Sequence, residues 1–216
     1  MRFLFKLIAA FFVLTTFRGC YPNGPEYNSD FDLVYTNYSS EFPFSQRQTF
    51  ALPDSVVKLT GDVVTNPGSP PSMLSSTYST VILNQLKQNM QQCGWTLVDK
   101  NSNPDVILLA MSTTTTNLYY YYDWGYWGWW YPGYSNGWGW YYPGYYPPYV
   151  SYYRSGSVFI QMVDQKTVAS PQGVGNVPVV WVSILNGLVE GGSADITNRI
   201  QTNITQAFTQ SPYLKH

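Results

Sequence analysis

The chain has 216 residues, which is enough for one domain of ordinary size with a sizeable core. Charged residues make up only 11% of it, with 11 basic against 12 acidic side chains. Without the three basic residues that precede Gly19, 8 basic residues face 12 acidic ones, a net charge of −4. That balance argues against nucleic acid and against an anionic membrane surface as electrostatic partners.

The first 20 residues have the pattern of a bacterial lipoprotein signal. Arg2 and Lys6 precede an apolar run over residues 7–17, which is too short to span a bilayer, and Gly19-Cys20 follows. We therefore expect residues 1–19 to be a signal peptide and Cys20 to be the acylated first residue of the mature chain. The alternative is cleavage elsewhere, with a disulfide between Cys20 and Cys93, which export would permit.

The segment after the cysteine, residues 20–30, is rich in Pro, Gly and polar residues and predicts a tether. A single domain is expected over residues 31–216. Apolar alternation and continuous Val-rich runs predict its strands at residues 31–35, 48–52, 55–59, 95–99, 106–111 with a continuation through 113–116, 157–164 and 177–185.

A helix is predicted after the Pro-rich loop at residues 66–71. Ser72 is its candidate N-cap, and apolar side chains recur at three-to-four spacing as far as Met90. Cys93 then falls in the last turn, and Gly94 occupies the position where a left-handed residue ends many helices.

A second amphipathic helix is predicted from Ser193, its candidate cap, to Pro212. Strands and helices in this order favour an α+β fold, a largely antiparallel mixed sheet with the two helices on one face. The apolar face of the second helix consists of Ile196, Ile200, Ile204 and Phe208.

Residues 119–153 form an aromatic tract with 14 Tyr and 6 Trp. Residues 127–134 recur, slightly changed, as residues 138–145, and each copy ends in Tyr-Pro-Gly-Tyr, which is typical of a type II turn. We expect the tract to be a long hairpin insertion between the strands at 106–116 and 157–164. It is either mobile or packed against the domain, a partner, a glycan or the lipid interface.

A low-complexity spacer is one interpretation of this tract. A second interpretation is glycan binding, in which sugar rings stack on the flat aromatic faces. A nucleic-acid platform would need interleaved basic residues, and only Arg154 is near. The candidate binding residues are Trp127, Trp129, Trp130, Tyr131, Trp138, Trp140 and Tyr142.

No constellation of catalytic or metal-binding residues is visible, so we expect neither an enzyme nor a cofactor. The only histidine is the last residue, His216, and no Cys or His cluster has zinc spacing. Cys93 is expected to be a buried small side chain. Five aspartates at predicted element ends are explained by caps and turns, although a catalytic pair among them stays open: Asp54, Asp62, Asp99, Asp105 and Asp164.

Short motifs in order along residues 20–211 resemble lipoproteins that carry domain of unknown function 4136. They are Cys20, the segments at residues 32–38, 42–45 and 49–54, Gly94-Trp95 with Val98-Asp99, Asn103-Pro104-Asp105-Val106, and residues 156–164 and 179–181. The resemblance implies an outer-membrane or periplasm-facing lipoprotein of Bacteroidota or their relatives, without catalytic residues or a known substrate. We therefore expect a membrane-anchored, non-catalytic binding or structural module of the cell envelope, with an envelope protein or a glycan as partner. The alternative is a glycan-binding module that uses the aromatic tract.

Overall fold

The computed structural model describes residues 32–59, 70–113, 124–131, 139–144, 156–168, 176–188 and 193–216. The signal peptide, Cys20 and the tether therefore lie outside the described residues, as do Asp62 and Trp138. The strands are β1 (Val34–Tyr38), β2 (Thr49–Ala51), β3 (Val57–Leu59), β4 (Thr96–Leu97), β5 (Val106–Thr113), β6 (Gly139–Tyr141), β7 (Val158–Asp164) and β8 (Asn176–Leu185). The helices are α2 (Ser76–Gln92), α3 (Gln165–Val168) and α4 (Ser193–Thr209), with short 3-10 turns η2 (Phe44–Gln46), η4 (Trp124–Trp127) and η5 (Pro212–Leu214).

The described strands form a mixed sheet in the order β1-β8-β7-β5-β2-β4, with β3 also paired to β5 and β6 to β8. The long pairings of β8 with β1, of β7 with β8 and of β5 with β7 are antiparallel. The parallel pairings involve only the short strands β2, β3, β4 and β6. The α+β prediction with a largely antiparallel mixed sheet is confirmed.

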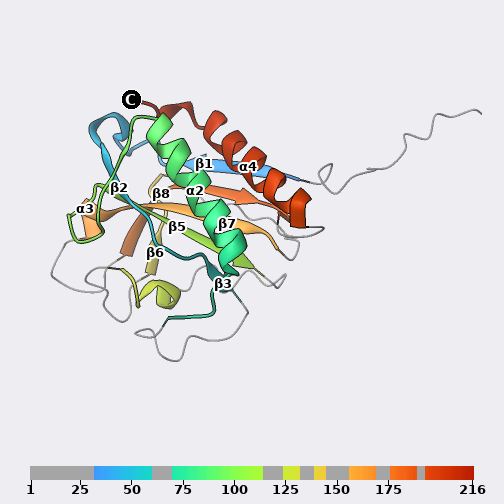
Figure 1. The fold of residues 1–216 in the computed structure, drawn as a ribbon. Helices are drawn as coiled ribbons and strands as arrows, with labels where there is room; N and C mark the ends of the chain where they lie inside the picture. Colours follow the sequence, from blue (N-terminus) through green and yellow to red (C-terminus); the bar gives the residue numbers. More distant parts are fainter. Residues whose placement is uncertain are drawn as a thin grey trace, which may run out of the picture.

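The two long helices lie side by side on one face of this sheet (Figure 1). Every fourth position of α4 is apolar, and the predicted face of Ile196, Ile200, Ile204 and Phe208 is buried against the sheet. From α2, Ile82, Leu86 and Met90 enter the same core. Within the described ranges, no helix combines the length and the apolar character needed to cross a membrane.

The start of α2 differs from the prediction. The helix begins at Ser76 after the N-cap Ser75, not after Ser72. The reason is that the residues before it pair with the β3 region: Lys58 N–H donates to the Ser72 carbonyl at 2.8 Å, and Leu74 N–H donates to the Val56 carbonyl at 2.9 Å. The predicted end is confirmed, because Cys93 is the C-cap and Gly94 has a φ of +97°.

Segments of the aromatic tract cover the opposite face of the sheet. Tyr126, Trp127, Trp130 and Tyr131 are buried in a second core, together with the β5 side chains that point away from the helices. Figure 1 shows η4 on the side of the sheet remote from α2 and α4. Every position of β5 is consequently buried, which explains its uninterrupted apolar sequence.

We expected the aromatic tract to extend a hairpin between β5 and β7, and this prediction is wrong for the described part of the tract. Residues 124–131 form a 3-10 turn and a bend, and β6 pairs in parallel with the start of β8, with Trp140 opposite Val177. The physical reason is that the second face of the sheet is rich in Val and Ile, and large aromatic rings bury more surface there than in an exposed hairpin. Gly144 has a φ of +73°, the conformation that the predicted type II turn requires.

Candidate functional site

Each copy of the near-repeat contributes to a cavity on the surface. The two copies are offset by eleven residues, so Trp130 corresponds to Tyr141, and Tyr131 corresponds to Tyr142. Trp130 lines a cavity of about 480 Å³, which we call the Trp130 pocket. Tyr141 lines a cavity of about 300 Å³, which we call the Tyr141 pocket. The repeat therefore gives the tract two related positions, one beside each cavity.

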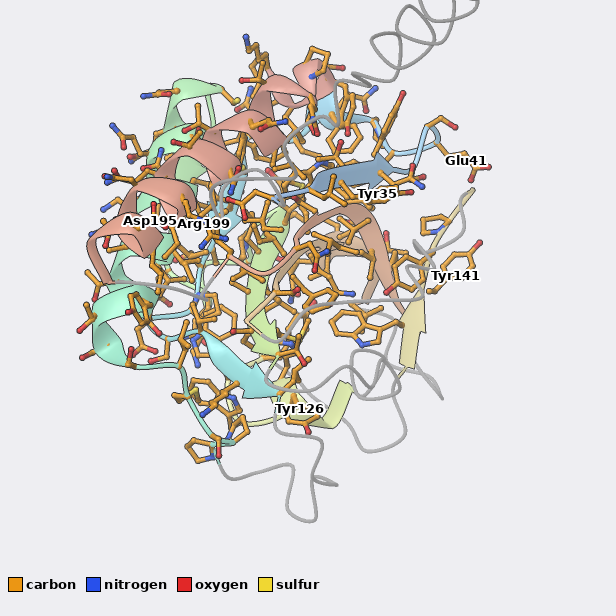
Figure 2. All side chains as sticks on the ribbon, turned by 90° about the vertical axis from the view of Figure 1, so that its right-hand side faces the viewer. Tyr35, Glu41, Tyr126, Tyr141, Asp195 and Arg199 are labelled. Carbon is orange, nitrogen blue, oxygen red and sulfur yellow. The ribbon has the colours of Figure 1, made fainter. Side chains whose placement is uncertain are left out.

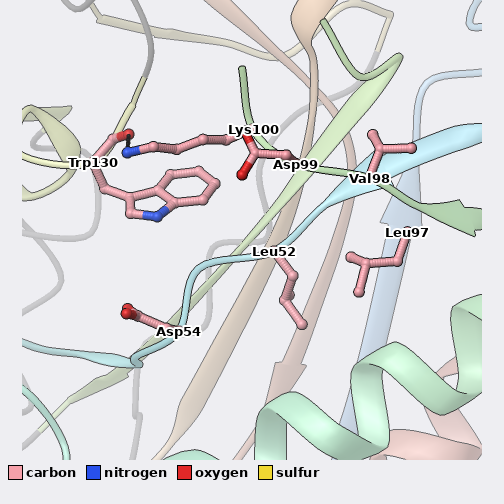
Figure 3. Close-up of a pocket in the computed structure, with 7 residues that line it drawn as sticks. All are labelled: Leu52, Asp54, Leu97, Val98, Asp99, Lys100 and Trp130. Atoms are coloured by element: carbon pink, nitrogen blue, oxygen red, sulfur yellow. Dashed lines mark hydrogen bonds between the residues drawn. The ribbon is translucent and has the colours of Figure 1, made fainter. Parts of the chain in front are cut away.

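The Trp130 pocket combines an aromatic ring, a lysine and two aspartates over an apolar wall (Figure 3). Lys100 Nζ lies 5.1 Å from the centroid of the Trp130 ring and donates a hydrogen bond to the Trp130 carbonyl at 3.0 Å. The cation thus occupies the face of the ring. A sugar could stack on Trp130 only after Lys100 had moved.

Asp54 and Asp99 line the Trp130 pocket from two different segments. Asp99 Oδ1 accepts the N–H of Asn101 at 2.8 Å, which is the turn role that the sequence predicts for it. Asp105 and Asp164 lie elsewhere, together at one end of the β5–β7 ladder, where Val106 pairs with Asp164. Among the residues that the structure describes, no group of three or more His, Cys, Asp or Glu side chains is placed to hold a metal ion.

Asp105 fastens the start of β2. Its Oδ2 accepts the backbone N–H of Gln48 at 2.9 Å and of Thr49 at 3.0 Å, and also the Thr49 hydroxyl at 2.9 Å. Burial by itself would raise the pKa of Asp105, but these hydrogen bonds and the charge of Lys166 outweigh it and lower the pKa. The carboxylate is therefore structural.

The Tyr141 pocket has a different set of polar groups. Glu41 and Arg47 come from the connection between β1 and β2, and Asp164 and Thr167 come from the junction of β7 and α3. Tyr141 belongs to the aromatic tract, and Figure 2 shows it on the same side of the molecule as Glu41. Its side chain is 51% exposed, which is unusual for a residue of the tract that the structure describes.

Arg47 is held in this pocket by packing instead of by hydrogen bonds. Its guanidinium carbon lies 5.5 Å from the centroid of the Phe42 ring, and its Nη2 lies 3.8 Å from Asp164 Oδ2, beyond hydrogen-bonding distance. Its Nε is buried and has no hydrogen-bond partner in the described part of the chain. Asp164 is satisfied otherwise, because it accepts the Lys166 N–H at 3.0 Å and the Thr167 hydroxyl.

The seven predicted binding residues are found mostly in the second core. Trp127, Trp130 and Tyr131 are buried, and burial together with the charge of Asp164 raises the pKa of Tyr131. Three further members are half-buried against the same core: Trp129, Trp140 and Tyr142. Trp138 lies outside the described residues.

The hydroxyl of Tyr142 accepts a hydrogen bond from Gln161 Nε2 at 2.9 Å, so its polar end faces the sheet. The residues that sequence reasoning missed are Tyr141, Glu41 and Arg47. The signal for Tyr141 was its correspondence to Trp130 in the repeat. No local pattern singles out Glu41 or Arg47, because they meet Tyr141 only in the folded chain.

Comparisons with known proteins give one clear family. The family model "Domain of unknown function (DUF4136)" matches residues 34–213. A crystal structure of a DUF4136 family protein from Bacteroides thetaiotaomicron is 34% identical and covers 85% of this chain and 97% of that chain, with a TM-score of 0.65. A crystal structure of a PDZ domain protein from Parabacteroides distasonis is 15% identical and covers 86% of this chain and 37% of that chain, with a TM-score of 0.41. Among curated proteins, none matches this chain.

Proposed function

The chain belongs to the DUF4136 family, and from this premise we propose that it is a non-catalytic, lipid-anchored binding module of the bacterial cell envelope. The observation that carries the anchor is the run of Arg2, Lys6, apolar residues 7–17 and Gly19-Cys20, a short distance before the domain. A lipid on Cys20 would hold the domain at the outer membrane.

The entry of the chain into the domain suits a tethered protein. Asp32, next to the expected tether, is bound by Arg199 and Asn203 of α4, and the following strand β1 pairs with β8 along its whole length. Tension on the tether would therefore be borne by the helix and by the sheet together.

The position of the single histidine supports a non-catalytic role. The His216 ring packs against the Trp95 ring with the centroids 4.8 Å apart, and its backbone N–H donates to the Cys93 carbonyl at 3.0 Å. It lines neither the Trp130 pocket nor the Tyr141 pocket. Without a histidine, the candidate general bases at the two cavities are carboxylates, Lys100 and Tyr141.

Acyl-chain labelling tests the anchor. Cells that produce the protein are grown with an alkyne-bearing fatty acid, and the purified full chain is then examined for the label. We expect label on the wild type and on Cys93→Ala, and none on Cys20→Ala. The Cys93 variant is a matched control because the chain has only two cysteines. A mature protein that begins anywhere other than Cys20 would refute the proposal.

Glycan binding by the aromatic tract is the second candidate, and the exposed ring of Tyr141 favours it. Trp129 and Trp140 are half-buried and near enough to the surface to report on a ligand. The measurement is tryptophan fluorescence of the full chain against a panel of envelope and host polysaccharides. Unchanged emission across the panel would remove this candidate while leaving the anchor untouched.

A further inference from the structure

We infer that the Tyr141 pocket is a binding site for a saccharide that carries a carboxylate, with Arg47 as the carboxylate partner and the Tyr141 ring as the stacking surface. This inference rests on the proposed binding function and names the ligand class. It also moves the site away from the tryptophans of the tract to a place where the tract meets the β1–β2 connection.

Arg47 is the group in the Tyr141 pocket that can bind a carboxylate. The Phe42 ring holds the guanidinium group in place, and Asp164, which lies 3.8 Å from it, also accepts hydrogen bonds from Lys166 and Thr167. The side chain of Arg47 is 25% exposed and lines the cavity, and its ion pair with Asp164, at 3.8 Å, is longer than a hydrogen bond. A planar carboxylate accepts paired hydrogen bonds from a guanidinium group better than other ligands do.

Tyr141 supplies the surface on which a sugar ring can stack. Its backbone is fixed by β6, which pairs Tyr141 with Pro178 of β8, and the Pro143-Gly144 turn follows directly. A Cβ at Gly144 would lie 3.3 Å from Glu41 Oε1, so the turn packs closely on Glu41. A half-exposed tyrosine ring on a fixed backbone is a flat, partly apolar surface of the kind that the carbon face of a sugar ring covers.

The charges around the cavity select among acidic ligands. Glu41 and Asp164 bring two negative charges to a site with one arginine, so a phosphate or another multiply charged ion would be repelled. A single carboxylate is repelled less than a multiply charged ion, and it can form paired hydrogen bonds with Arg47. The hydroxyl groups of a sugar supply donors for Glu41, and the Thr167 oxygen can accept one more hydrogen bond. The volume of about 300 Å³ is at the small end of ligand pockets, which suits a short saccharide.

The cavity lies at the opposite end of β1 from the point where the chain enters the domain. Glu41 follows the C-terminal end of β1, whereas Asp32 enters the domain at the other end, where Arg199 holds it. In Figure 2, Glu41 and Tyr141 lie on the side of the molecule opposite Asp195 and Arg199. Two sources share the required chemistry, an acidic polysaccharide from outside the cell and the peptide carboxylates of cell-wall fragments.

Calorimetric titration of the full chain in detergent tests the inference. The probes are a trisaccharide with one galacturonic acid residue, its carboxyl-reduced neutral trimer and a disaccharide-peptide fragment of peptidoglycan. We expect at least one acidic probe to bind about tenfold or more tightly than the neutral trimer. Binding of only the uronate indicates an external polysaccharide, and binding of only the peptidoglycan fragment indicates a cell-wall ligand; either result supports the site.

Variants assign the contacts. Arg47→Ala is expected to abolish the preference for the acidic probe, with Arg47→Lys in between, and Tyr141→Ala is expected to weaken binding about tenfold, with Tyr141→Phe retaining it. Tyr35→Ala is the matched control, because Tyr35 is a 37% exposed tyrosine of β1 that does not line the cavity. Equal binding of acidic and neutral trimers, no binding of either acidic probe, or an unchanged preference in Arg47→Ala would overturn the inference. Acylation of Cys20 and the fluorescence response to other glycans are measured separately, so the proposed function can stand when this site fails.

Discussion

Arg199 and Asp32 form a buried ion pair that joins α4 to the point where the chain enters the domain. Arg199 Nε donates to Asp32 Oδ2 at 2.8 Å, and the side chains are only 4% and 7% exposed. Asn203 Nδ2 donates to the same carboxylate at 2.8 Å, and Arg199 also donates to the Gly187 carbonyl at 2.9 Å. The pair therefore links the segment before β1, the end of β8 and α4.

Removing Asp32 should destabilise the domain strongly, because it leaves the charge of Arg199 buried without its main partner. We expect Asp32→Ala to lower the free energy of unfolding by about 3–5 kcal/mol in urea titrations. Asp195→Asn is the control, since that carboxylate is 55% exposed and 3.9 Å from Arg199 Nη1, and its loss should cost less than about 1 kcal/mol. Similar effects of the two substitutions would show that the pair does not hold the entry segment.

The second core should depend on Trp127. This side chain is fully buried between the tract and the sheet, and Trp127→Ala should cost about 3–5 kcal/mol of unfolding free energy. Tyr141→Ala, an exposed aromatic of the same tract, should change stability by no more than about 0.5 kcal/mol. If thermal and urea unfolding of the Trp127 variant matched the wild type, the tract would not be part of the folded core.

Asp105 should make the domain sensitive to acid. Because its pKa is lowered in the folded state, the ionised carboxylate stabilises the fold above the pKa of the unfolded chain, and this contribution is lost as the pH falls through the lower folded value. Asp105→Asn should weaken the fold at pH 7 by about 1–2 kcal/mol and flatten the acid limb of the stability curve. Urea midpoints measured between pH 7 and pH 3 check both expectations, and parallel curves would contradict them.

Cys93 should be unreactive in the folded protein. Burial raises the pKa of its thiol, although the charge of Lys215 opposes this shift, and the side chain is 6% exposed. In Cys20→Ala, a thiol reagent at pH 8 should react slowly with the native chain and rapidly in denaturant. Fast reaction of the native protein would show that the C-terminal end of α2 opens readily.

Periodicity in the sequence predicted the helices, the long strands and the α+β class. The four-residue spacing from Ile196 to Phe208 is a local property, and the helix face followed directly from it. The start of α2 could not be predicted, since residues 72–74 hydrogen-bond to the distant β3 region instead of beginning the helix. Composition left the aromatic tract either mobile or packed against another surface, and it did not show that the other face of the sheet was available.

The amino-acid sequence by itself determined which segments form strands and helices, because side-chain alternation and capping act over a few residues. It also carries the expected acylation at Cys20, which stays a prediction for labelling to test. The role of the aromatic tract follows only from the tertiary structure, which buries Trp127 and Tyr131 and leaves Tyr141 exposed. The tertiary structure alone brought Glu41, Tyr141 and Asp164 to one cavity. Glu41 lies 100 positions before Tyr141 and 123 before Asp164, and such distant residues meet only when sheet pairing and burial of both faces are satisfied together.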